Sequence, residues 1–165
     1  MKILSNKEFK KELAEILTYD IFTVECLDLD CDSNDIVLDI QDINIITKDK
    51  YLLVMSSFEQ YCLNSAKEAM KSTIIDFEEN NLSLTEADGI LVYFQMNSNY
   101  DTDDLIEAMQ IIYDSSTKYT YITGDPDVLF GVVCDNSLKN DYAKVTVFIS
   151  YSKQRRGCSA NNKGV

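Results

Sequence analysis

The chain has 165 residues, 45% of them hydrophobic, with no apolar run as long as a membrane span and no basic-then-apolar leader. This composition predicts one cytoplasmic domain with its own core and no membrane association. The formal net charge is −13, and residues 1–152 carry 11 basic and 28 acidic side chains, so we expect no binding to nucleic acid. Five cysteines without C-x-x-C spacing and the absence of histidine predict reduced thiols and no zinc site.

The first predicted element is a helix over residues 7–17. Ser5 and Glu8 form a capping-box pattern just before it. An acid-rich connection over residues 28–35 follows, and then a short helical segment over residues 40–47. The apolar stripe of the first helix consists of Phe9, Leu13, Ile16 and Leu17.

The acid-rich connection has some features of a calcium-binding loop. Oxygen-bearing residues fall on the ligand positions of an EF-hand-like loop, but Ser33 replaces the glycine of its sharp turn and Asp35 replaces an apolar residue. Suitable flanking helices are also missing from the pattern. We therefore predict a solvated connection and no metal site. The residues on the ligand positions are Asp28, Asp30, Asp32, Asn34 and Asp39.

The next elements are a strand over residues 51–55 and a helix over residues 58–77. Ser57 and Gln60 offer a second capping box for this helix. Its predicted buried face consists of Cys62, Ala66, Ala69, Met70, Thr73 and Phe77.

A nearly continuous apolar run predicts a strand over residues 90–96. Asp101 or Thr102 can cap the helix that follows, in which Leu105, Met109, Ile112 and Tyr113 form the buried stripe. After the turn at Pro126, a strand over residues 128–133 and a strand over residues 144–150 are predicted to form a hairpin closed by residues 135–141.

From Tyr51 the order of elements is βαβαββ, which predicts an α/β (α+β two-layer) fold. We expect a mixed, mostly parallel four-stranded sheet with two helices on one face, preceded by the N-terminal helix. That helix, a partner or water would cover the other face. The predicted organisation is an N-terminal helix and acidic connection over residues 1–35, a domain over residues 36–152 and a basic, disordered tail over residues 153–165.

Residues 36–150 resemble the C-terminal domain of FtsZ, the bacterial tubulin-like division GTPase. The resemblance is carried by residues 127–149 (D-V-L-F-G-V-V-C-D-N-S-L-K-N-D-Y-A-K-V-T-V-F-I), by residues 87–94 (A-D-G-I-L-V-Y-F) and by residues 38–42 (L-D-I-Q-D). The family's nucleotide-binding half, with its G-G-G-T-G-T-G phosphate loop, has no counterpart in these residues. The resemblance therefore implies no cofactor and no GTP binding by this chain itself.

In FtsZ-like proteins and tubulins, an acidic loop of one subunit completes GTP hydrolysis in its neighbour by orienting the attacking water. The resemblance places Asp39 and Asp42 on the two acidic positions of that loop, as catalytic residues acting in trans. Leu38, Ile40 and Gln41 complete a partner-binding segment with them. Ile40 departs from the family's aromatic residue and Gln41 from its small residue. In the alternative reading, the two aspartates are simply solvated or cap a helix.

The resemblance implies a protein-interaction module that docks on, caps or modulates FtsZ-like filaments in cell division and septation. Its partner would be an FtsZ-like GTPase subunit or a second copy of the chain, and the chain would not be an enzyme by itself. It could also be a fragment of a longer FtsZ-like GTPase. Two alternatives remain: a small-molecule-binding or enzymatic oligomer, which a concave polar pocket or a basic cluster would favour, and an acidic nucleic-acid mimic, which evenly spaced rows of carboxylates would favour.

Overall fold

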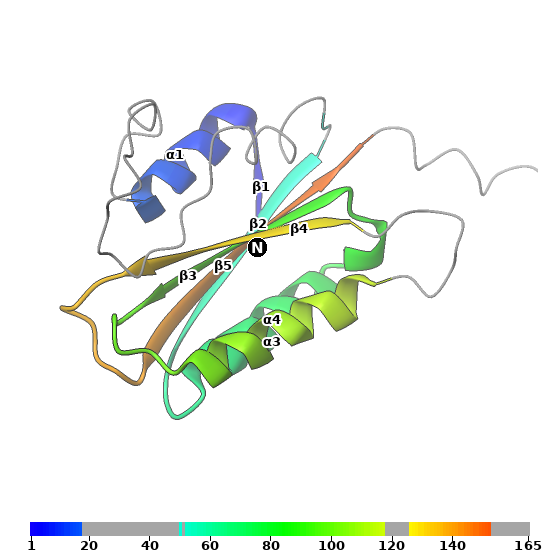
Figure 1. The fold of residues 1–165 in the computed structure, drawn as a ribbon. Helices are drawn as coiled ribbons and strands as arrows, with labels where there is room; N and C mark the ends of the chain where they lie inside the picture. Colours follow the sequence, from blue (N-terminus) through cyan, green and yellow to red (C-terminus); the bar gives the residue numbers. More distant parts are fainter. Residues whose placement is uncertain (18–49, 51, 118–125, 153–165) are drawn as a thin grey trace, which may run out of the picture.

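The computed structural model describes residues 1–17, 50, 52–117 and 126–152, shown as the coloured ribbon in Figure 1. These residues form an α/β two-layer domain, as the sequence predicts. The elements are β1 (Lys2–Leu4), α1 (Asn6–Leu17), β2 (Leu52–Tyr61), α3 (Ser65–Glu79), the 3-10 helix η2 (Leu84–Glu86), β3 (Gly89–Met96), α4 (Thr102–Ser116), β4 (Asp127–Cys134) and β5 (Tyr142–Tyr151).

The described strands form one mixed sheet with the order β1-β2-β5-β3-β4. β3 and β4 pair in parallel, whereas β5 lies antiparallel between β2 and β3. The predicted βαβαββ order is confirmed from β2 onward. The sheet has one strand more than predicted, because β1 adds antiparallel to the outer side of β2.

The predicted hairpin is wrong. Strands β4 and β5 are not paired with each other, since β3 lies between them. Residues 135–141 instead pass around the end of β3, where Asp135 N–H donates to the carbonyl oxygen of Met96 at 2.8 Å and the Asn97 side chain donates to that of Leu138 at 2.7 Å. The polar residues of this segment are typical of a tight hairpin turn, but here they connect β4 to β5 across the end of β3.

Helices α3 and α4 pack side by side on one face of the sheet (Figure 1). Their apolar stripes and the facing sheet residues form the larger hydrophobic core. Fully buried members include Met70 and Phe77 of α3, Ile112 of α4, Phe94 of β3 and Val147 of β5. This layer confirms the prediction that two helices share one face.

Helix α1 covers part of the opposite face (Figure 1). Phe9 and Leu13, on one side of α1, pack against Leu91 and Phe148 in a second hydrophobic cluster. The Phe9 and Phe148 rings meet edge to face with centroids 5.0 Å apart. Burial of each such side chain contributes about 2–3 kcal/mol to stability, so α1 is held by packing.

The boundary between β2 and α3 differs from the prediction. Strand β2 continues to Tyr61, because residues 52–61 pair with β5 along their whole length. Ser57, predicted to cap a helix, instead exchanges a hydrogen bond with Thr146 of β5 at 2.8 Å. The helix begins only at Ser65, after Asn64 with a left-handed φ of 61°.

Two other helix starts agree with the sequence. Ser5 N–H donates to the Glu8 carboxylate at 2.8 Å and Glu8 N–H donates to Ser5 Oγ at 3.3 Å, which confirms the first capping box. Asp101 accepts from Asp103 N–H at 2.9 Å and caps α4. In contrast, the prediction that Tyr113 belongs to the buried stripe of α4 is wrong, since this residue is 45% exposed.

Candidate functional site

The segment predicted to act in trans lies outside the described residues. Leu38, Asp39, Ile40, Gln41 and Asp42 all fall within residues 18–49. The EF-hand-like positions fall in the same range. The role of Asp39 and Asp42 therefore stays a prediction from the resemblance. The cavity formed by the described residues is a different site.

An open cavity of about 410 Å³ lies on the α1 face of the sheet, between β1 with α1 and the second half of β2. Its floor consists of polar side chains of β2, β5 and β3, such as Ser57, Thr146 and Gln95. Further along the same face, beneath α1, the side chains of these three strands are apolar. The sheet therefore changes along one face from apolar core to the floor of a polar cavity. The cavity is lined by Met1, Lys2, Glu12, Glu15, Met55, Ser56, Ser57, Phe58, Glu59, Gln95, Lys144 and Thr146.

The charges in the cavity are largely paired. Lys2 Nζ lies 2.8 Å from a Glu12 carboxylate oxygen, and the hydrogen bond and charge of Glu12 raise the pKa of Lys2. Glu15 lies 3.6 Å from Lys11 across an exposed turn of α1. Because the lining holds Lys2 and Lys144 against three glutamates, the cavity offers no concentrated positive charge for an anionic ligand.

Glu59 and Tyr142 form a second polar contact at the end of β2. The Tyr142 hydroxyl donates to the Glu59 carboxylate at 3.1 Å. Burial, with the neighbouring Glu59, raises the pKa of Tyr142 to about 12. The phenol therefore remains a donor at neutral pH and holds Glu59 beside Lys144, its cross-strand partner on β5.

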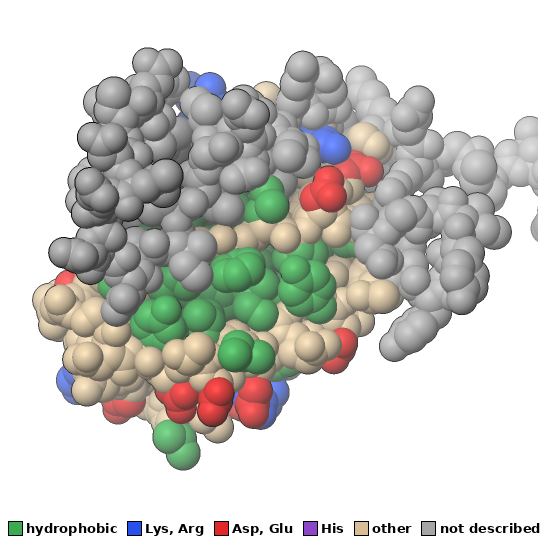
Figure 2. Space-filling view, in the orientation of Figure 1, with side chains coloured by type: hydrophobic (Ala, Val, Ile, Leu, Met, Phe, Trp, Pro, Cys, Tyr) green, Lys and Arg blue, Asp and Glu red, His purple; other side chains and the backbone are tan. Residues whose placement is uncertain are grey.

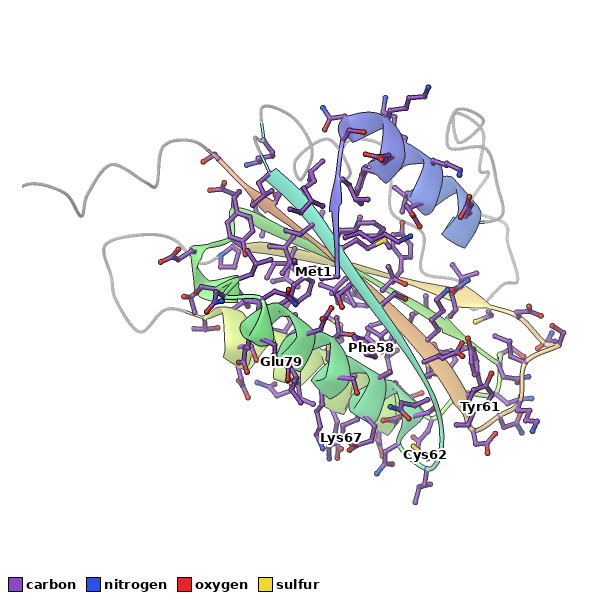
Figure 3. The ribbon with its side chains drawn as sticks, turned by 180° about the vertical axis from the view of Figure 1, so that it is seen from behind. Met1, Phe58, Tyr61, Cys62, Lys67 and Glu79 are labelled. Atoms are coloured by element: carbon purple, nitrogen blue, oxygen red, sulfur yellow. The ribbon has the colours of Figure 1, made fainter. Side chains whose placement is uncertain are left out.

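Apolar side chains are exposed beside this cavity, at the end of β2 and in the turn that follows it. Phe58 is 36% exposed, Tyr61 59% and Leu63 85%. Tyr61 packs on Tyr142 with ring centroids 4.8 Å apart, which fixes its orientation. Figure 3 shows Phe58 and Tyr61 along β2, on the side of Met1 away from the start of the strand. We call Phe58, Tyr61 and Leu63 the β2 tip.

The sequence reading missed the β2 tip because it assigned residues 58–64 to a helix. No sequence signal marks it, because residues 53–59 (L-V-M-S-S-F-E) lack the alternation of apolar and polar side chains that is typical of a half-buried strand. In the structure, successive side chains of β2 nevertheless point to opposite faces. Odd positions such as Leu53, Met55 and Ser57 share the α1 face, whereas Val54 and Ser56 face α3.

The other edge of the sheet also carries apolar side chains. Figure 2 shows hydrophobic side chains gathered over β4 near the centre of the view, with acidic side chains along the lower border. Val128, Leu129 and Phe130 are half-buried there. Val128 and Phe130 also pack against the larger core, and Leu129 packs against the second cluster, so β4 contributes to the cores on both faces of the sheet.

Neither a metal centre nor a membrane span is present in the part of the chain that the structure describes. Within residues 1–17, 50, 52–117 and 126–152, no group of three His, Cys, Asp or Glu residues could hold a metal ion. None of the described helices is long and apolar enough to cross a bilayer.

The structure is similar to solved structures of FtsZ. An empty FtsZ dimer from M. jannaschii matches with a TM-score of 0.55 and 17% identity, over 79% of this chain and 38% of that chain. A tryptophan-to-tyrosine mutant of M. jannaschii FtsZ matches with a TM-score of 0.59 and 17% identity, over 92% of this chain and 43% of that chain. CetZ2 from Haloferax volcanii, in a GTPgS-bound protofilament, has a TM-score of 0.43 and 12% identity, over 72% of this chain and 34% of that chain.

The two FtsZ matches show that the chain has an FtsZ-like fold. The chain spans less than half the length of the FtsZ chains that it matches, as the resemblance to the C-terminal domain alone predicts. The matched part is therefore not a complete FtsZ. No protein-family model matches the chain, and no curated protein matches it in sequence.

Proposed function

We propose that this chain is a cytoplasmic protein-interaction domain that docks on an FtsZ-like subunit and modulates filaments in cell division. The observation that supports this proposal is the pair of coverage values: 79–92% of this chain matches 38–43% of FtsZ. A domain with the shape of one part of FtsZ can meet the surface that this part meets in an assembly. Fold kinship alone does not carry function, so the proposal needs a direct test.

The chemistry of docking would come from residues 38–42. Asp39 and Asp42 would approach a nucleotide held by the partner subunit and orient the attacking water. Leu38, Ile40 and Gln41 would supply contact area beside them. The chain would contribute to hydrolysis only in trans, since its 165 residues contain no glycine-rich phosphate loop.

The test is sedimentation of a GTP-assembled FtsZ-like protein with and without this chain, together with its rate of GTP turnover. We expect both quantities to change at stoichiometric excess, and Asp39→Ala to remove the change in turnover. Asp141→Ala is the matched control, because Asp141 is an exposed carboxylate outside the proposed segment. Unchanged polymer yield and turnover at excess would end the filament proposal.

A fragment of a longer FtsZ-like GTPase is the second form of the same proposal. It predicts that antibodies against this domain detect a protein of about twice this length in the source cell, in keeping with the 38–43% coverage. A native protein of 18.8 kDa would favour the stand-alone form.

The polar cavity is the feature that a small-molecule-binding protein would show. Lys2 is held by Glu12 and Lys144 lies opposite Glu59, however, so the cavity has no basic cluster. Protein binding therefore remains the proposal that the described surface supports best.

A further inference from the structure

We propose that the outer edge of β2, from Ser57 to Tyr61, binds an extended basic segment of another protein as an additional β-strand. This interaction goes beyond docking on an FtsZ-like subunit through residues 38–42 and uses different residues. Its recognition chemistry is main-chain pairing combined with a carboxylate and apolar side chains.

The edge exists because β1 is shorter than β2. Strand β1 pairs only with Leu53, Val54 and Met55, and its last pair is Lys2 with Met55. On the other side, β5 pairs with β2 from Leu52 to Tyr61. In the described part of the chain, no strand pairs with the outer side of β2 beyond Met55.

The hydrogen-bonding groups on this edge follow from the ladder. Cys62 N–H donates to the Asp141 carbonyl at 3.0 Å, one step beyond the Tyr61–Tyr142 pair. Because main-chain groups alternate sides along an antiparallel strand, even-numbered residues of β2 bond to β5. The N–H and C=O groups of Ser57, Glu59 and Tyr61 therefore point outward.

The cavity lies along the same edge. Its lining includes Ser57, Phe58 and Glu59, with Met1 at one end and Glu12 and Glu15 of α1 on one wall. Five residues of an incoming strand would extend about 17 Å, at about 3.3 Å per residue. Such a strand would start where β1 stops and continue its line toward the β2 tip, so it would lie partly within the cavity.

Charge and apolar surface select the incoming segment. Glu59 is exposed on the edge, and the cavity lining holds three carboxylates, of Glu12, Glu15 and Glu59, against two lysines, Lys2 and Lys144. The net charge of −13 adds a long-range attraction for cations. A lysine or arginine opposite Glu59, next to an apolar residue that packs on Phe58 on the other face, fits this pattern. Tyr61 lies on the same face as Glu59 and can pack on the aliphatic stem of a second basic side chain two residues along.

A second copy of the chain fits the same edge poorly. Met1 lies next to Ser56, so a paired strand can use only Ser57 to Tyr61. Two-fold antiparallel pairing over these residues places Glu59 directly opposite Glu59 of the other copy. Like charges in this position destabilise a sheet, and both copies carry the same large negative charge.

Fluorescence anisotropy with a labelled peptide tests the proposal. The probe is an acetylated, amidated heptapeptide of alternating lysine and valine, and the first control is the same peptide N-methylated on alternate amides, which cannot pair with an edge. We expect binding of the probe and at least about tenfold weaker binding of the methylated peptide, because the methyl groups remove several main-chain hydrogen bonds. In amide NMR spectra, the largest shifts should fall on residues 57–61.

Matched protein variants separate edge binding from general charge attraction. Glu59→Gln keeps an acceptor for Tyr142 and should weaken probe binding severalfold, whereas Glu79→Gln, at the far end of α3 in Figure 3, should leave it unchanged. Equal loss in both variants, or equal binding of the methylated peptide, would overturn the proposal. A concentration-dependent dimer that excludes the probe would also overturn it in favour of self-association. Docking through residues 38–42 could fail without changing any of these results.

Discussion

Asp104 of α4 caps the start of α3, where its carboxylate accepts hydrogen bonds from the N–H groups of Ala66 at 2.9 Å and Lys67 at 3.0 Å. One buried side chain thus satisfies two end groups of a neighbouring helix and locks the two helices together. We expect Asp104→Ala to lower the free energy of unfolding by about 2–4 kcal/mol, measured by urea denaturation. Asp103→Ala, an exposed neighbour in the same turn, should cost less than about 1 kcal/mol. Equal losses would show that Asp104 does not act as a cap.

The Asp76 carboxylate should make stability depend on acid pH. Ser56 donates a hydrogen bond to Asp76, and the Met1 ammonium lies 3.0 Å from it. The Ser56 hydrogen bond, aided by the ammonium, holds the pKa of Asp76 below its ordinary value of 3.8. The ionised group therefore contributes stability above that pH, and the contribution is lost as pH falls through the folded pKa.

Asp76→Asn should accordingly be less stable than the parent at pH 7, and the difference should shrink as the pH falls below about 4. Urea midpoints across this range measure it. A difference that stays constant down to pH 2 would mean that the ionised form contributes nothing.

Tyr142 should titrate later than an ordinary tyrosine. Burial, reinforced by Glu59, raises its pKa to about 12 from 10.0, so its contribution to stability is present below pH 10 and is lost as pH rises toward 12. NMR of the ring carbons should resolve this late titration. Glu59→Gln should lower the raised pKa of Tyr142 only in part, because burial is the larger cause of the shift. A return of this pKa to the ordinary value would show that Glu59 is the larger cause.

Phe9 should be the main anchor of α1. It is 1% exposed and packs edge to face on Phe148. Phe9→Ala should lower the free energy of unfolding by about 3–5 kcal/mol, whereas Phe58→Ala removes the same side chain from a 36% exposed position and should cost much less. Urea denaturation compares the two. Similar losses would contradict the assignment of Phe9 to the second core.

Features that depend on nearby residues could be predicted from the sequence. The Ser5–Glu8 capping box formed as expected because both groups lie within one helical turn. The capping role of Asp101 and the burial of Leu105 and Ile112 in α4 also follow from local spacing.

Features that depend on distant residues could not be predicted in this way. Ser57 and Gln60 satisfy the capping pattern as well as Ser5 and Glu8 do, but β5, more than eighty residues later, pairs with both as part of β2. The position of β5 between β2 and β3 has no signature in the loop over residues 135–141. Strand β1 is only three residues long, which is too short for a periodic pattern.

The candidate site likewise depends on residues that are distant in the sequence. The polar cavity requires α1, β2, β5 and β3 to meet, and only the fold reveals that Glu12, Ser57 and Thr146 line one space. The family resemblance identified Asp39 and Asp42 as candidate catalytic residues, and their role remains a prediction to be tested by polymer sedimentation.

The central place of β5 has a consequence for how the protein is made. β2 and β3 have no backbone pairing with each other, and β5 is bonded to both. A ribosome adds roughly 5–20 residues per second, so the nascent chain spends seconds with two half-built layers before residues 142–151 emerge. During that interval β2 and β3 lack the strand that pairs with both, so the sheet cannot close until β5 has been synthesised.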